Sequence, residues 1–108
     1  MLQLKEHVVI RGNKYTNAIL RAVQVVYPRY SADKIEVVTS GNDSKHGTKS
    51  YHYKDRALDI RFWNIPADKR EQVAVEIRAE LPTYFDVVIE ADHYHIEADE
   101  VKEQHGTT

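Results

Sequence analysis

The hydrophobic positions of the first forty residues follow a helical spacing and then a strand-like run. From about residue 13 to residue 26, apolar residues recur at i, i+3, i+4 and i+7, which is the spacing of an amphipathic helix. These residues are Ile19, Ala22, Val23 and Val26. Pro28 is expected to end the helix. The next segment, KIEVVTSG, is rich in β-branched residues and closes on Ser40-Gly41, so it predicts a short strand.

The rest of the chain repeats this change of period. The segment RALDIRFW alternates as a strand does, with Ala57, Asp59 and Arg61 on one side and Leu58, Ile60 and Phe62 on the other. A second helix is predicted between Pro66 and Pro82, because an apolar stripe runs along it. The stripe consists of Val73, Ala74, Ile77 and Leu81. FDVVIE and HYHIE then predict two strands joined by a tight turn near Ala91-Asp92.

The predicted order is helix, strand, strand, helix, strand, strand. This order is typical of an α+β domain with a small antiparallel sheet flanked by two helices. At 108 residues the chain can bury one core but has no room for a second module, so residues 1–108 are expected to form a single domain. The polar C-terminal segment, from about residue 100 to residue 108, is expected to fray.

Composition and charge narrow the classes of function. Hydrophobic residues make up 42% of the chain and charged residues 30%, as in ordinary soluble globular proteins. The formal net charge of -2 gives no reason to expect a nucleic-acid partner, because proteins that bind nucleic acids usually carry a basic surplus. No apolar run is long enough for a membrane span. The N-terminal MLQLKEHVVIRG lacks a signal-peptide core, which predicts a protein that is cytoplasmic as synthesised.

Histidine and acidic residues gather in two stretches, SYHYKDRALDI and IEADHYHIE. Because the chain has no cysteine, any metal site must be built from His, Asp and Glu. Residues i and i+2 of a strand point to the same face, so His93 and His95 are expected to project together. A catalytic zinc ion keeps three protein ligands and one open position for water. His52, Asp59 and one of these two histidines would supply the three ligands.

The alternative is that each of these residues has only a structural role, as a surface or hydrogen-bonded side chain. A His-x-His pair on a strand is, by itself, more often a surface or hydrogen-bonded feature than a metal site. Asp59 alone could accept a hydrogen bond from the backbone or from an arginine, and His46 alone could be an exposed loop residue. It is the conjunction of the two stretches that favours a metal site.

The first stretch resembles the S-x-H-x-x-G-x-A-x-D signature of the zinc D-Ala-D-Ala carboxypeptidase and phage endolysin peptidase family. This family shares a superfamily with the lysostaphin-type peptidases and the hedgehog signalling domain. The matching residues are Ser50, His52, Ala57 and Asp59. ADHYHIE is similar to the closing H-x-H strand of the family, and the similarity runs from about Val37 to Glu97. The resemblance implies a hedgehog-like or D-Ala-D-Ala-peptidase-like fold.

The resemblance also implies a metal centre. The second histidine of the family's H-x-H strand binds zinc and the first lies beside the reacting centre, which implies that Zn²⁺ is held by His52, Asp59 and His95. His46, six residues before His52, matches a further histidine of the relatives. His93 and His46 are expected to donate hydrogen bonds to the oxyanion or to orient the substrate.

The general base has two candidates. Glu90 matches an acid that recurs just upstream of H-x-H, and it is expected to take the proton of the zinc-bound water. The alternative is Asp92, which stands three residues before His95, a spacing at which some relatives have an acid. Strict alternation along the strand argues against Asp92, although a turn at Ala91-Asp92 would break that alternation.

Two positions depart from the family pattern. Asp55 stands where the signature has glycine, and aspartate is among the residues that tolerate a left-handed turn. Many relatives carry an arginine after the SG that opens the loop, thought to hold a substrate carboxylate, whereas this chain reads SGNDSK. Lys45, Arg56 and Arg61 are the cations left for that role.

The function implied by the resemblance is hydrolysis of an amide bond in the stem peptide of bacterial peptidoglycan. The enzyme would be a D,D-carboxypeptidase or an endolysin-type endopeptidase, and it would reach the cell wall by phage-type release. One alternative is a non-catalytic, zinc-stabilised module that binds protein, like the hedgehog domain or a component of a virion or tail. Another is a small α+β fold without metal. A monomer is expected, although the sequence does not fix the oligomeric state.

Overall fold

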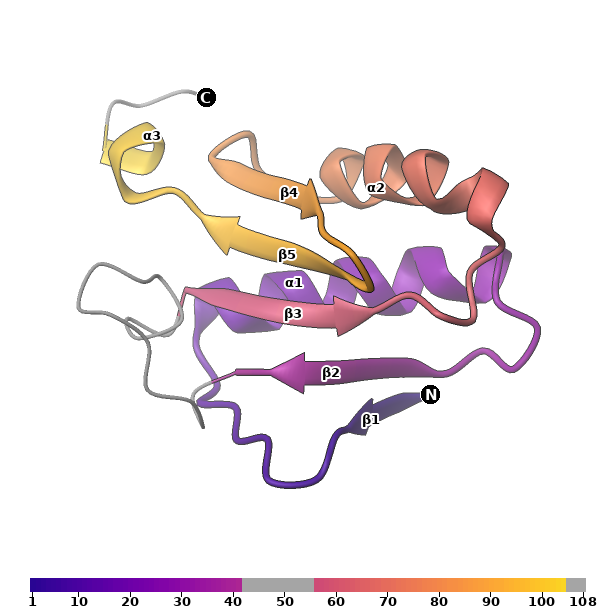
Figure 1. Ribbon diagram of the computed structural model, residues 1–108. Coiled ribbons are helices and arrows are strands. Elements are labelled where there is room, and N and C mark those ends of the chain that lie inside the picture. The colour runs from indigo at the N-terminus through magenta and orange to yellow at the C-terminus, as the bar shows by residue number, and fades with distance from the viewer. Residues whose placement is uncertain (42–55, 105–108) are drawn as a thin grey trace.

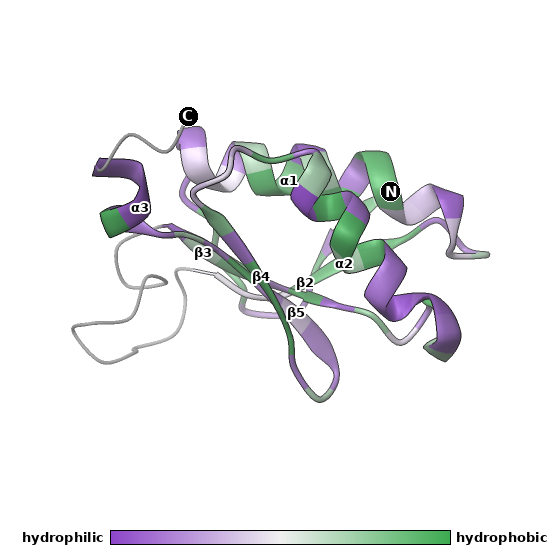
Figure 2. Cartoon of the chain, turned by 90° about the horizontal axis from the view of Figure 1, so that it is seen from above, coloured by the Kyte–Doolittle hydropathy of each residue, from purple (hydrophilic) through white to green (hydrophobic). Residues whose placement is uncertain are grey.

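The computed structural model describes residues 1–41 and 56–104. Within these residues five strands form one mixed sheet in the order β1-β2-β3-β5-β4 (Figure 1). Viewed from above, helices α1 and α2 lie on the same side of this sheet (Figure 2). The strands are β1 Leu2–Leu4, β2 Glu36–Ser40, β3 Ala57–Arg61, β4 Phe85–Ile89 and β5 His93–Ala98. The helices are α1 Lys14–Val26, η1 Tyr27–Arg29, η2 Ala67–Lys69, α2 Arg70–Ala79 and α3 Glu100–Gln104, of which η1 and η2 are 3₁₀ turns.

Helix α1 confirms the first predicted helix and begins at a capping box. The side chain of Asn13 accepts hydrogen bonds from the backbone N–H groups of Tyr15 and Thr16, and the hydroxyl of Thr16 accepts one from the N–H of Asn13. All four predicted apolar positions are fully buried. Pro28 does not end the helix directly, because it lies in the first turn of η1, where its missing N–H costs no hydrogen bond.

The second predicted helix is also present, as η2 followed by α2. Pro66 precedes η2, and α2 ends before Pro82. The predicted apolar stripe is buried, with Val73, Ala74 and Ile77 at 0% exposure and Leu81 at 8%. The prediction was therefore correct for both the limits and the buried face of this segment.

The α+β class is confirmed, but two details of the predicted sheet are wrong. The sheet is mixed, because β1 pairs parallel to β2 with Leu2 opposite Glu36, whereas the other three strand pairs are antiparallel. The helices α1 and α2 also share one face instead of flanking the sheet. Strand β1 has three residues, and a segment of this length is too short to show a period of two.

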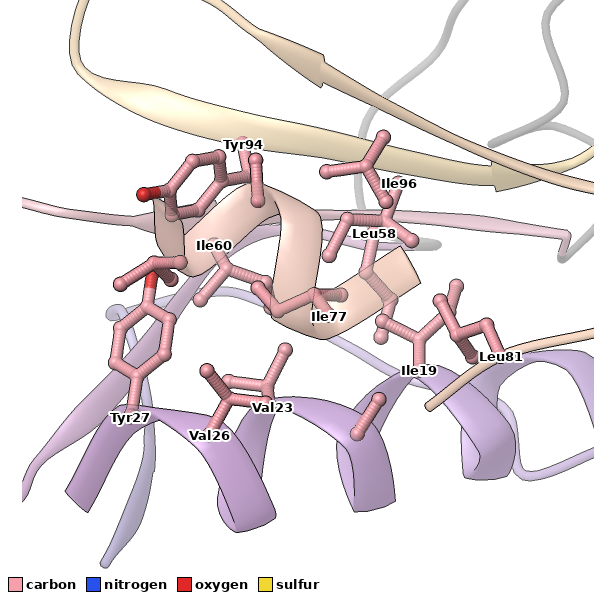
Figure 3. Close-up of a cluster of buried hydrophobic side chains, with 14 of the residues drawn as sticks. Ile19, Val23, Val26, Tyr27, Leu58, Ile60, Ile77, Leu81, Tyr94 and Ile96 are labelled. Atoms are coloured by element: carbon pink, nitrogen blue, oxygen red, sulfur yellow. The ribbon is translucent and has the colours of Figure 1, made fainter. Parts of the chain in front are cut away.

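The hydrophobic core lies between the helices and one face of β3 and β5 (Figure 3). Leu58 and Ile60 of β3 and Tyr94 and Ile96 of β5 are all fully buried in it. Because a strand alternates its side chains, Asp59, His93 and His95 point to the opposite face, as predicted. We call this second face of β3, β5 and β4 the polar face.

The segment after β5 differs from the predicted fraying tail. Residues 100–104 form the short helix α3, and residues 105–108 lie outside the described part of the chain. The carboxylate of Glu103 accepts hydrogen bonds from the hydroxyl of Tyr15 at 2.8 Å and from Nη2 of Arg56 at 2.9 Å, which fixes α3 to the start of α1 and β3. Within the described residues, none of the helices is both long enough and apolar enough to cross a membrane.

Candidate active site on the polar face

The register of β3 and β5 places the candidate residues next to one another. Asp59 lies opposite His95, and Arg61 lies opposite His93. Directly opposed residues of an antiparallel pair have Cβ atoms about 5 Å apart, so their side chains are in reach of each other. The alternation that buries Tyr94 thus brings two histidines and one aspartate to a single patch of the polar face.

Asp59 is the centre of this patch. Its Oδ1 lies 2.8 Å from Nδ1 of His95, and its Oδ2 lies 3.6 Å from Nε2 of His93. The side chains of Asp59 and His95 are only 16% and 21% exposed. The hydrogen bond with Asp59 is the main reason that the pKa of His95 is raised, although burial acts in the opposite direction. Asp59 and His95 therefore form a partly buried acid–imidazole pair.

Glu97 is a member of the site that the sequence analysis missed. Its Oε1 lies 2.9 Å from Nε2 of His95, so both ring nitrogens of His95 have a carboxylate partner. The signal was present in the sequence, because Glu97 follows His95 by two residues on the same strand and must share its face. A carboxylate on one imidazole nitrogen fixes the ring and raises the basicity of the other nitrogen.

The two candidate bases lie at the hairpin between β4 and β5. The chain reverses at Ala91-Asp92 as predicted, and the N–H of Glu90 donates to the carbonyl of His93 at 2.9 Å. This pairing sets Glu90 opposite His93, and alternation along β4 puts its side chain on the polar face. Glu90 is exposed, and within the described residues its side chain makes no hydrogen bond or ion pair.

Asp92 contacts the site more closely than Glu90 does. Its Oδ1 lies 2.6 Å from Nδ1 of His93, and this hydrogen bond is the largest cause of a lowered pKa for Asp92. Because Nδ1 of His93 is engaged by Asp92, Nε2 is the nitrogen that faces Asp59. Asp92 therefore orients the His93 ring, whichever acid is the base.

The predicted metal ligands are described only in part. Asp59 and His95 come together, whereas His52 and the further histidine, His46, lie outside the described residues. In the described part of the chain no set of three His, Asp or Glu residues could hold a metal ion. The available pair suits zinc: a tetrahedral ion with bonds of about 2.0–2.1 Å needs donor atoms about 3.3 Å apart. The donors Oδ1 of Asp59 and Nδ1 of His95, 2.8 Å apart, need only a small separation to reach that spacing.

The cations left to bind a substrate carboxylate differ in their surroundings. Arg56 is buried, donates to the carbonyl of Ala98 at 3.0 Å and stacks 4.0 Å above the ring of Tyr15, in addition to its ion pair with Glu103. These contacts occupy Arg56 in the structure. Arg61 lies on the polar face opposite His93, and Lys45 is outside the described residues.

A comparison of the chain with models of known protein families finds no match, and a search of curated proteins finds no significant match.

Proposed function

We propose that this protein is a zinc-dependent peptidase that cleaves an amide bond in the stem peptide of bacterial peptidoglycan. It would act as a D,D-carboxypeptidase or an endolysin-type endopeptidase, on a fold like that of the hedgehog and D-Ala-D-Ala-peptidase superfamily. The observation that carries the proposal is the pairing of Asp59 with His95. These residues are 36 positions apart and belong to the two motifs that resemble the family, and they meet at 2.8 Å on one face.

The zinc ligands in this proposal are His52, Asp59 and His95. A zinc ion supplies a Lewis acid that lowers the pKa of its bound water toward neutrality and polarises a carbonyl. The donor chemistry is appropriate, because zinc accepts neutral imidazole and carboxylate ligands. Glu97 supports the set by holding Nε2 of His95, which leaves Nδ1 to face Asp59.

The remaining residues of the site are proposed to transfer the proton of the water and to bind the substrate carbonyl. Glu90 is the proposed general base, and its place opposite His93 supports that role because both side chains belong to the polar face. His93 is oriented by Asp92 and would donate from Nε2 to the oxygen of the scissile carbonyl. His46 is proposed to assist His93. Asp92 is the rival base, and its bond to His93 supports the orienting role instead.

The alternative function is a zinc-stabilised module that binds protein without catalysis. One observation favours it: both nitrogens of His95 are hydrogen-bonded to carboxylates, as in a structural polar cluster. The position of Glu90 opposite His93 supports the enzyme, because an exposed carboxylate beside the imidazole is placed where it could take a proton. Under the enzymatic proposal the protein acts on the cell wall after phage-type release.

The two functions are separated by a turnover assay. The protein is incubated with purified peptidoglycan and with muropeptides, and new amines or released D-Ala are measured by mass spectrometry before and after chelation. Glu90→Gln should abolish turnover and keep zinc, whereas Asp92→Asn should lower turnover by a smaller factor. Zinc-loaded protein that cleaves none of these substrates would support the protein-binding module. Full turnover by Glu90→Gln would instead remove Glu90 as the base.

A further inference from the structure

An arginine stacked on an exposed tryptophan lies at one end of the polar face. The guanidinium carbon of Arg61 is 3.8 Å from the centroid of the Trp63 ring, which is within the range of a cation–π contact. Trp63 is 65% exposed, which is unusual for the largest apolar side chain and leaves its ring accessible. Within the described residues Arg61 makes no ion pair. In the part of the chain that the structure describes, the guanidinium of Arg61 is therefore held against the Trp63 ring and has no carboxylate in ion-pair contact.

This pair lies beside the proposed reacting centre. Arg61 is opposite His93, and it follows Asp59 by two residues on β3, a distance of about 7 Å along the strand. The carbonyl of Arg61 accepts a hydrogen bond from the buried hydroxyl of Tyr27 at 2.8 Å, which holds the backbone of the residue in place. A peptide over Asp59 and His95 would thus have its next residue or two at Arg61.

Asp92 does not form an ion pair with Arg61. Arg61 is among the lesser causes that lower the pKa of Asp92, after the hydrogen bond from His93. The carboxylate of Asp92 is instead bound to His93 at 2.6 Å. A guanidinium held above an indole ring can still offer its N–H edge to a planar anion, which is the geometry in which an arginine binds a carboxylate.

We propose that Arg61 and Trp63 form a subsite for a carboxylate of the bound peptide. The N–H edge of Arg61 would bind the carboxylate and the indole would contact the adjoining aliphatic group. The identity of the substrate rests on the proposed function, whereas the binding of a carboxylate does not. The loop after SG lacks the arginine that many members of the resembling family carry there. Arg61 would supply a cation for the substrate carboxylate from a different position, on β3.

The test uses fluorescence, because Trp63 is the only tryptophan of the chain and reports on the subsite directly. N-acetyl-D-alanyl-D-alanine and its C-terminal amide are titrated into the full-length protein, as purified and again after chelation, so that binding to Arg61 is separated from binding to zinc. The acid should change the emission of Trp63 in a saturable way, and the amide should bind about tenfold or more weakly, because one charge-assisted contact is lost.

Variants then assign the effect to the guanidinium. Arg61→Ala should weaken binding of the acid about tenfold or more, and Arg61→Lys should lie between Arg61→Ala and the wild type because it keeps the charge and loses the fork. Arg21→Ala is the control: this residue is on α1, on the other side of the sheet, and its side chain is 65% exposed. If Arg61→Ala does not fold by circular dichroism, Arg61→Gln replaces it.

The outcomes distinguish this subsite from the proposed function. Equal affinity for acid and amide, no saturable change with either ligand, or unchanged affinity in the folded Arg61 variant would overturn the subsite. Carboxylate-selective binding that depends on Arg61 would support it even in a protein that holds no zinc and cleaves no muropeptide. Cleavage of muropeptides with equal affinity for acid and amide would support the peptidase and reject the subsite.

Discussion

Replacement of Glu97 by alanine should weaken zinc binding by about tenfold to a hundredfold. The reason is the contact between Oε1 of Glu97 and Nε2 of His95, which is 2.9 Å long. The side chain of His95 is 21% exposed and that of Glu97 is 19% exposed, so water screens this contact only in part. A charge-assisted hydrogen bond of this kind contributes about 1.5–3 kcal/mol, and about 1.4 kcal/mol corresponds to a tenfold change in dissociation constant.

The assay is competition for zinc between the protein and a chromophoric chelator. Glu97→Gln retains an acceptor oxygen and loses the charge, so it should lie between Glu97→Ala and the wild type. Asp86→Ala is the matched control, because Asp86 is opposite Glu97 on β4, carries the same charge and contacts Lys102 instead of an imidazole. Equal zinc affinity in Glu97→Ala and the wild type, or an equal loss in Asp86→Ala, would refute the argument that the hydrogen bond to His95 is what matters.

Three further predictions concern the scaffold of the site. Tyr94→Phe removes the hydrogen bond of its buried hydroxyl to the carbonyl of Arg70 and should lower the free energy of unfolding in urea by about 1 kcal/mol; no change would mean that the bond contributes nothing. Ile96→Ala empties part of the core behind His95 and should cost about 2–5 kcal/mol by the same measurement, a smaller loss indicating that the core collapses around the gap. The pKa of Glu103 is lowered to about 2, from an ordinary value of 4.5 in the unfolded chain, and the largest cause is its hydrogen bond with Arg56. Its stabilisation is thus complete above the unfolded value and is lost as the pH falls through about 2, so Glu103→Gln should lose less stability than the wild type on acidification, and parallel losses would contradict this.

The elements with a clear period were predictable from the sequence. Helix α1 has both an apolar stripe and the capping side chain of Asn13, and β5 alternates between buried Tyr94 and Ile96 and polar histidines. These two features fix which side chains share a face. They are sufficient to predict that His93 and His95 project together, although they do not give the distance to Asp59.

The elements that were missed depend on contacts distant in sequence. Strand β1 is three residues long and forms by pairing parallel to β2, and α3 is fixed by the contacts of Glu103 with Tyr15 and Arg56. Neither contact leaves a local pattern. Glu97 is different, since its place on β5 was predictable from alternation, but its hydrogen bond to His95 depends on how the two side chains are oriented. The stacking of Arg61 on Trp63 likewise depends on the path of the chain after β3 ends.

The most direct test of the account is the zinc content of the purified protein, measured by mass spectrometry after removal of loosely bound metal. The wild type and His7→Asn, which changes a histidine whose side chain is 88% exposed outside the site, should hold one zinc ion per chain. His93→Asn should retain zinc, whereas Asp59→Asn and His95→Asn should lose it while remaining folded. A wild type without zinc, or full zinc content in His95→Asn, would contradict the metal site from which the proposed function is argued.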